Sequence, residues 1–90
     1  MNSVNFQIVV DPSAAKDLKR LNPSQREVSR HIVLLIDSLS FSPHLGKPLK
    51  GNKKGCYSLR YGDYRVIYEI YHQIKTIHII RIGHRREVYR

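Results

Sequence analysis

The chain has 90 residues, 41% of them hydrophobic, and a formal net charge of +9. This length fits one domain near the lower limit for a self-sufficient core, and the hydrophobic content excludes a disordered chain. No apolar run approaches the roughly 20 residues of a membrane-spanning helix. The single cysteine, Cys56, excludes an intrachain disulfide and indicates a reducing compartment. We therefore expect one soluble, cytoplasmic domain that spans residues 1–90.

The excess of basic residues predicts an anionic partner, either nucleic acid or an acidic protein. A membrane surface fits poorly, because the basic residues do not line one face of an amphipathic helix opposite bulky apolar residues. No membrane association is expected.

Residues 5–10 (NFQIVV) are rich in β-branched and aromatic residues, so they predict a short strand. Asp11 and Pro12 follow as a candidate helix N-cap and first helical residue. The pair at 22–23 ends this helix, and Pro23 with Ser24 opens a second one. Its apolar residues repeat at helical spacing: Val28, Ile32, Leu35, Ile36 and Leu39.

Residues 40–55 are rich in Pro, Gly and Lys and predict a loop. Strands are expected at 56–61, 64–71 and 76–82, with turns at 62–63 and 72–73. The order β-α-α-β-β-β defines an α+β fold, in which a helical hairpin packs on an antiparallel sheet. The other face of that sheet is left to meet a ligand.

The Gly62-Asp63 turn sets the register of two strands. If the loop is those two residues, Arg60 stands directly opposite Arg65. Like charges at opposing positions are destabilising, so a bound phosphate is the natural compensation. The alternative is that both arginines point into water and splay apart.

A basic tail follows the last strand. Gly83 permits a bend or bulge that would swing the tail across the sheet. Arg85 and Arg86 would then add positive charge, and Tyr89 would transfer a proton if a neighbouring cation stabilised its phenolate; its alternative role is packing. His84 is a second candidate for proton transfer or phosphate contact, or else a surface polar residue.

The loop lysines predict either a solvated loop or salt-sensitive attraction to phosphates: Lys47, Lys50, Lys53 and Lys54. The histidines lack metal-ligand spacing, and the carboxylates are not clustered as a metal-dependent nuclease needs. We expect no metal and no cofactor.

The runs GDYRVIYEI and IHIIRIGHRREVYR resemble the RelE branch of the RelE/ParE toxin superfamily, and the element order agrees over nearly the whole chain. The resemblance implies a type II toxin, a ribosome-dependent endoribonuclease that cuts mRNA in the decoding site and inhibits translation. It also implies a cognate acidic antitoxin, RelB-like, that binds and neutralises the toxin.

By the same resemblance, Arg65 and Arg85 match arginines that contact the reacting phosphate, and Tyr89 matches a tyrosine of proton transfer. Two lysines of the best-studied type fall at Ser58 and Arg60, so one position has lost its charge. The implied reaction is attack of the 2′-hydroxyl on the adjacent phosphate, with Arg60 assisting.

Two other functions stay open. A ParE-type relative binds DNA gyrase without cutting RNA. An inactive homologue that only binds RNA or the ribosome is the other alternative, and Ser58 gives it weight.

Overall fold

The computed structural model describes residues 5–21 and 25–89. In these residues the chain forms five strands, three α-helices and one short 3-10 helix, η1. The elements are β1 Gln7–Val10, α1 Pro12–Leu21, α2 Arg26–Leu39, β2 Lys47–Pro48, η1 Gly51–Lys53, β3 Cys56–Tyr61, β4 Tyr64–Tyr71, β5 Thr76–His84 and α3 Arg85–Val88.

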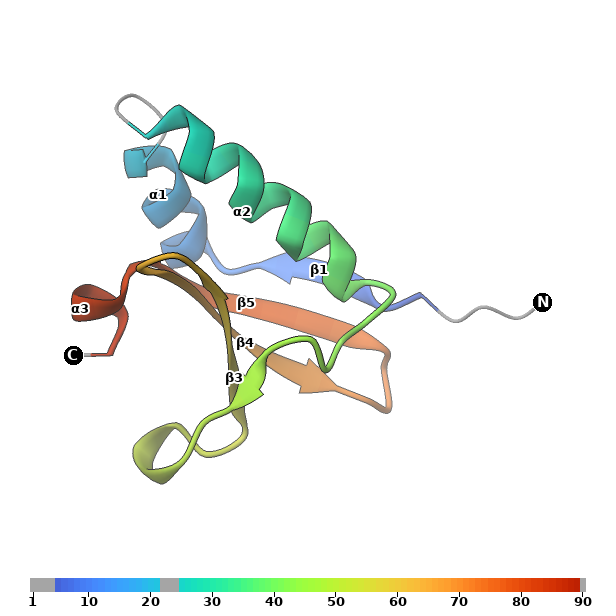
Figure 1. Cartoon of the computed structure of the whole chain (residues 1–90). Coiled ribbons are helices and arrows are strands. Elements are labelled where there is room, and N and C mark those ends of the chain that lie inside the picture. The colour runs from blue at the N-terminus through green and yellow to red at the C-terminus, as the bar shows by residue number, and fades with distance from the viewer. Residues whose placement is uncertain (1–4, 22–24, 90) are drawn as a thin grey trace.

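The strands form one sheet in the order β1-β5-β4-β3-β2, in which β1 runs parallel to β5 and the other pairs are antiparallel. Helices α1 and α2 cover one face of this sheet, and α3 follows the end of β5 near the C-terminus (Figure 1). The predicted α+β fold with a helical hairpin on the sheet is confirmed. Pro23 and Ser24, predicted to open the second helix, lie outside the described residues.

Three features differ from the sequence prediction. The loop at 40–55 contains the edge strand β2, and β5 extends to His84 instead of ending near residue 82. The basic tail, for which no helix was predicted, forms α3. Short elements such as these carry too few residues for a periodic pattern, so tertiary contacts decide them.

The predicted helix start at Asp11 is confirmed. Its carboxylate accepts hydrogen bonds from the Ser13 backbone N–H (3.1 Å) and hydroxyl (2.6 Å). These bonds lower the pKa of Asp11 below its ordinary value of 3.8, with a smaller contribution from His78. The carboxylate therefore stays ionised and caps the orphan amides of the first turn.

Strand alternation divides the sheet into two faces. Leu59, Val66 and Tyr68 belong to the core cluster beneath the helices, together with Ile32 and Ile36 of α2. Their neighbours in sequence point to the opposite face, which carries the residues of the candidate site.

A buried carboxylate fastens α1 to β5. Asp17, 7% exposed, accepts hydrogen bonds from the Arg81 Nε and the Ile82 backbone N–H, both at 2.9 Å. Because both donors belong to the last strand, this contact fixes the helical layer against the strand that leads into α3.

No helix in the described ranges 5–21 and 25–89 is long and apolar enough to cross a membrane.

Candidate functional site

The β3–β4 hairpin carries the predicted pair of arginines. Gly62 adopts a positive φ of 60°, which suits glycine in this tight turn. Arg60 is the register partner of Arg65, and Tyr61 is the partner of Tyr64, so the predicted register is confirmed. Both arginines point to the face opposite the helical hairpin, because Leu59 and Val66, their neighbours in sequence, face the core.

The guanidinium of Arg65 is anchored at the turn. Its Nη1 donates to the backbone carbonyls of Gly62 (2.9 Å) and Tyr64 (3.0 Å). An arginine has five N–H donors, so one nitrogen fixes the group while the other nitrogens keep donors for a ligand. The half-buried Arg65 is therefore oriented before any ligand arrives.

The tail crosses the open face of the sheet through α3. His84 caps this helix, since its Nδ1 accepts the Arg86 backbone N–H at 3.2 Å. The predicted bend at Gly83 is wrong in position: Gly83 is a buried residue within β5, and the chain turns only after His84. Val88, 2% exposed, is the buried residue of α3. A Cβ on Gly83 would lie 3.4 Å from the Val88 Cγ1, an ordinary van der Waals distance, so α3 packs closely over this residue.

Tyr89, which follows α3, contacts β3. Its hydroxyl lies 2.7 Å from the Ser58 hydroxyl, a hydrogen bond between two parts of the chain 31 positions apart. Ser58 faces the same side of the sheet as Arg60. The tertiary structure thus brings the terminal tyrosine next to the arginine pair.

These residues line one cleft of about 450 Å³. One side, the hairpin wall, consists of Ser58, Leu59, Arg60 and Arg65; the other, the loop wall, is residues 45–49, and Tyr89 also lines the cleft. None of the described residues that line it is acidic. Its cationic side chains belong to Lys47, Arg60 and Arg65, an arrangement suited to a phosphate.

Lys47 is the site residue that the sequence did not single out. It lies on β2 as the register partner of Ser58, so its side chain adds a third cation to the cleft. Its only signal in the sequence is one basic residue among several in a Pro- and Gly-rich loop. The pairing with β3 depends on the contacts that hold the preceding segment.

Those contacts come from the core. The Tyr68 hydroxyl donates to the Pro43 carbonyl (2.8 Å) and accepts the Gly46 backbone N–H (2.9 Å). Burial raises the pKa of Tyr68, outweighing the opposing effect of the Gly46 bond, so the phenol stays protonated and keeps its donor. A Cβ on Gly46 would lie 2.8 Å from both the Ser58 carbonyl oxygen and the Tyr68 hydroxyl, so only glycine fits this approach.

Two predicted lysines lie beside the cleft. Lys50 and Lys53 line an adjoining hollow of about 260 Å³, which also shares Tyr89. Lys54 follows at the end of η1 and is exposed. These lysines extend the positive charge outward from the phenol of Tyr89.

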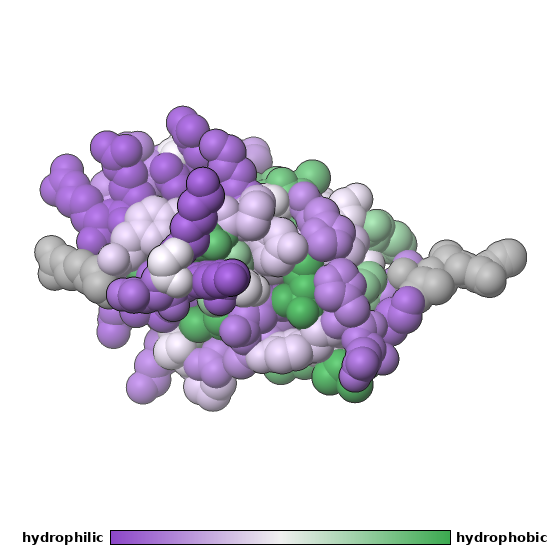
Figure 2. Space-filling model, turned by 90° about the horizontal axis from the view of Figure 1, so that it is seen from below, coloured by the Kyte–Doolittle hydropathy of each residue, from purple (hydrophilic) through white to green (hydrophobic). Residues whose placement is uncertain are grey.

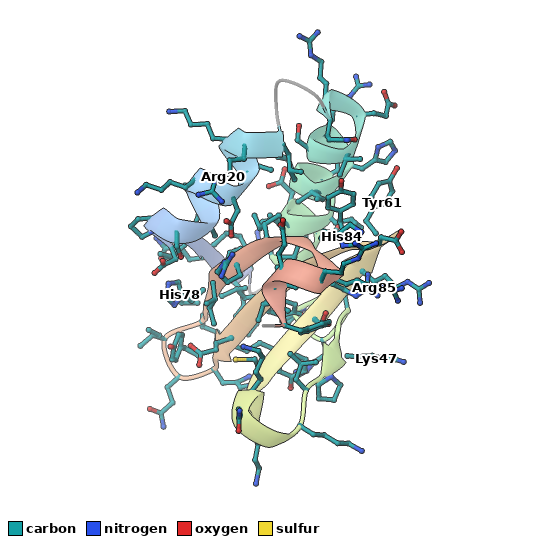
Figure 3. All side chains as sticks on the ribbon, turned by 90° about the vertical axis from the view of Figure 1, so that its left-hand side faces the viewer. Arg20, Lys47, Tyr61, His78, His84 and Arg85 are labelled. Carbon is teal, nitrogen blue, oxygen red and sulfur yellow. The ribbon has the colours of Figure 1, made fainter. Side chains whose placement is uncertain are left out.

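His84 and Arg86 lie apart from the cleft. Together with Arg20 of α1 they line a separate hollow of about 540 Å³. Arg85 is exposed and, among the described residues, is not part of the cleft lining. Figure 3 places Arg85 on the same side of the molecule as Lys47, and Arg20 on the opposite side.

Hydrophilic side chains cover most of the face seen in Figure 2, and hydrophobic ones are visible only as small separate patches. Within residues 5–21 and 25–89, no three His, Cys, Asp or Glu side chains are grouped to hold a metal ion. The chemistry available in the cleft is therefore that of guanidinium, ammonium and hydroxyl groups.

Comparison with known proteins agrees with this architecture. Residues 8–89 match the family model of the ParE toxin of the type II toxin–antitoxin system parDE. Toxin RelE of Mycobacterium tuberculosis is 36% identical over 80 residues, covering 84% of this chain and 80% of that protein. Toxin RelG of the same organism is 35% identical over 79 residues, covering 87% of this chain and 88% of that protein.

A solved structure agrees as well. The toxin–antitoxin complex RelBE2 from Mycobacterium tuberculosis contains a chain that superposes with a TM-score of 0.81 at 30% identity, covering 90% of this chain and 99% of that one. The family-model match over residues 8–89 includes the helical hairpin, the strands from Ile8 onward and the tail that carries Tyr89. The chain is therefore a toxin of the RelE/ParE family of type II toxin–antitoxin systems.

Proposed function

We propose that this toxin is a ribosome-dependent endoribonuclease that cuts mRNA and thereby stops translation. The observation that carries the proposal is the cleft that Arg60, Arg65 and Lys47 line together with Tyr89. Cations that converge on one point stabilise the extra negative charge of a phosphate under attack. A phenol at the same point is placed to transfer a proton.

The proposed reaction needs no metal, because RNA carries its own nucleophile. The 2′-hydroxyl attacks the adjacent phosphorus in line, and the bond to the 5′-oxygen breaks, leaving a 2′,3′-cyclic phosphate and a 5′-hydroxyl. In this scheme Arg65 and Arg60 stabilise the charged phosphate, the 2′-hydroxyl releases its proton to water, and Tyr89 donates a proton to the leaving 5′-oxygen. Arg85 acts from outside the cleft as a contact to the RNA strand, since it is exposed on the same side as Lys47.

Secondary phosphate contacts are assigned to Lys50, Lys53 and Lys54 on one side and to His84 and Arg86 on the other. The lysines extend the positive charge beyond Tyr89, and His84 and Arg86 line the separate hollow between α1 and α3. A strand that crosses the cleft would meet positive charge at both ends. Action on the ribosome would place the protein in the cytoplasm.

The first test is substitution of Arg65 by alanine. Because the guanidinium is held at the cleft by the turn, its loss should abolish growth arrest and cleavage of translated messages. Cleavage is read by mapping 5′ ends on a translated message in a cell-free system. The matched control is Arg26→Ala, which removes the same charge from an exposed position of α2. Full cleavage by Arg65→Ala would refute the assignment.

A second candidate is inhibition of DNA gyrase without RNA cleavage, which the ParE description of the matched family favours. The two functions separate in one comparison: gyrase supercoiling and cleavage of a translated message are measured with the same protein. The nuclease proposal expects cleavage and undisturbed supercoiling. The reverse result would assign the protein to the gyrase-binding type, and neither activity would favour an inactive RNA- or ribosome-binding homologue.

The neutralising partner is proposed to be an acidic, RelB-like antitoxin. A net charge of +9 on a small domain is matched by an acidic segment laid across the basic face, and the RelBE2 structure is a toxin–antitoxin complex. Co-expression with the cognate antitoxin should restore growth to cells that express the toxin. The purified complex should lose RNA binding, and unchanged RNA binding in that complex would count against this mode of neutralisation.

A further inference from the structure

Ser58 is one of three polar or charged residues of the described chain that are buried, with only 8% of its surface exposed. It lies on β3, between β2 and β4, where both neighbouring strands hold the backbone. Its hydroxyl points into the cationic cleft and meets the Tyr89 hydroxyl at 2.7 Å, the usual length of a good O–H···O bond. A fixed polar group in this place has a use beyond packing.

Tyr89 is in the opposite situation. It is 43% exposed and follows the four-residue helix α3. A side chain that is this exposed keeps one position only if a specific contact offsets the entropy it loses. The bond to Ser58 is the hydrogen bond of its side chain within the described residues, so β3 decides where the phenol stands.

The direction of this bond matters for chemistry. Either hydroxyl is able to donate. When Ser58 donates, the phenolic oxygen accepts and its own hydrogen is left to point at a ligand in the cleft. The same donor stabilises the phenolate that forms when the proton leaves, because a hydrogen bond to the charged form favours it.

Two cationic side chains beside the pair are placed to bind a ligand. Lys47 is the register partner of Ser58 on β2, and Arg60 is two residues further along the same face of β3. Register partners on adjacent strands project side by side from the sheet. A phosphate held between these cations lies next to the bonded phenol.

We propose that Ser58 is the positioning residue of the cleft: its hydroxyl donates to the Tyr89 phenolic oxygen and aims the phenol proton at a phosphate held by Lys47 and Arg60. This inference rests on the proposed ribonuclease function. In this role Ser58 acts on the reaction through Tyr89.

The test compares Ser58→Ala, Ser58→Thr and Tyr89→Phe in single-turnover cleavage of a translated message. A positioned acid–base group contributes about 100-fold or more, so Tyr89→Phe should lose at least that much in rate. Ser58→Ala should lose about 10-fold in the maximal single-turnover rate, with the half-saturating toxin concentration within about 2-fold, because the phenol remains but no longer keeps one orientation. Ser58→Thr keeps the hydroxyl and should recover the rate to within about 2-fold.

A further measurement separates positioning from packing. In a double-mutant cycle, Ser58→Ala should cost nothing more in the Tyr89→Phe background, since the two residues act as a unit. Independent, multiplying losses would overturn the inference.

The inference is also checked without cleavage. A ¹⁹F NMR spectrum of protein containing 3-fluorotyrosine reports on Tyr89, whose signal is assigned by its loss in Tyr89→Phe. Ser58→Ala should shift or broaden this signal, and Ser58→Thr should restore it. An unchanged signal would reject the positioning role even if the wild type cuts RNA. A changed signal in a wild type that cuts no RNA would leave the contact in place and reject the ribonuclease proposal.

Discussion

The two walls of the cleft are built by different physics. The hairpin wall is local: a turn with glycine at positive φ joins two long strands, and Arg60 faces Arg65 as a direct consequence. The loop wall is held from a distance, since its entry is fixed by the hydroxyl of Tyr68 and by close contact of Gly46 with β3. The hairpin wall is specified by the sequence of the hairpin itself. The loop wall depends on Tyr68, which lies more than twenty positions away in the sequence.

The comparison also separates stability from function. Two arginines at opposing positions cost the free protein some stability through repulsion. Tyr68 and Gly46 act in the opposite direction, because they stabilise the fold while carrying no charge to a ligand. Substitutions in the two walls should therefore move stability and RNA binding in different combinations.

The largest effect is expected from Gly46→Val. A branched side chain would meet the Ser58 carbonyl and the Tyr68 hydroxyl, and overpacking of this kind costs about 3 kcal/mol. Urea unfolding measures the loss, and binding to a short RNA should fall with it, because Lys47 leaves its place beside β3. The exposed Ser42→Val in the same loop is the control. Unchanged stability in Gly46→Val would mean that the loop wall is not packed against β3.

Tyr68→Phe should have an intermediate effect. It keeps the ring but leaves the Pro43 carbonyl and the Gly46 N–H without their partner, at a cost of about 1–2 kcal/mol. Tyr57→Phe is a matched control, since that ring stacks on Tyr68 with centroids 5.4 Å apart. The free energy of unfolding should fall for Tyr68→Phe and change little for the control. Equal losses in the two variants would show that the cost is not specific to the two hydrogen bonds of the Tyr68 hydroxyl.

The smallest effect, and one of opposite sign, is expected from Arg60→Gln. Removing one of two opposed like charges should stabilise the free protein by about 0.5 kcal/mol at low salt, and the gain should fade as salt screens the pair. RNA affinity should fall in the same variant. Arg26→Gln on α2 is the control for net charge. A loss of stability in Arg60→Gln would show that this arginine contributes more by packing than it costs by repulsion.

The sequence alone predicts much of this architecture for clear reasons. Long periodic segments, such as the apolar repeat of α2 and the β3–β4 pair, identify themselves because each residue reinforces the same pattern. Asp11 marks a helix start and Gly62 a turn for local chemical reasons that the structure confirms. The resemblance to the RelE/ParE family is carried by the runs GDYRVIYEI and IHIIRIGHRREVYR, and both lie within the matched residues 8–89.

Short or contact-dependent elements escape that reasoning. The two residues of β2 and the four of α3 are too few to show a period. Lys47 therefore remained one loop lysine among several, and the turn after β5 was expected at Gly83 instead of after His84. The separate hollow that His84 and Arg86 share with Arg20 likewise brings together residues from opposite ends of the chain.

The sequence by itself determined the two-layer fold, the strand register at the turn and the facing pair Arg60 and Arg65, because each of these follows from local spacing and turn geometry. The tertiary structure decided that Tyr89 reaches Ser58, that Lys47 completes the cleft and that Arg85 lies outside its lining. These placements depend on buried contacts between distant segments, above all the Tyr68 hydroxyl and the room at Gly46. Such contacts have no period and no local motif, so only the packed molecule reveals them.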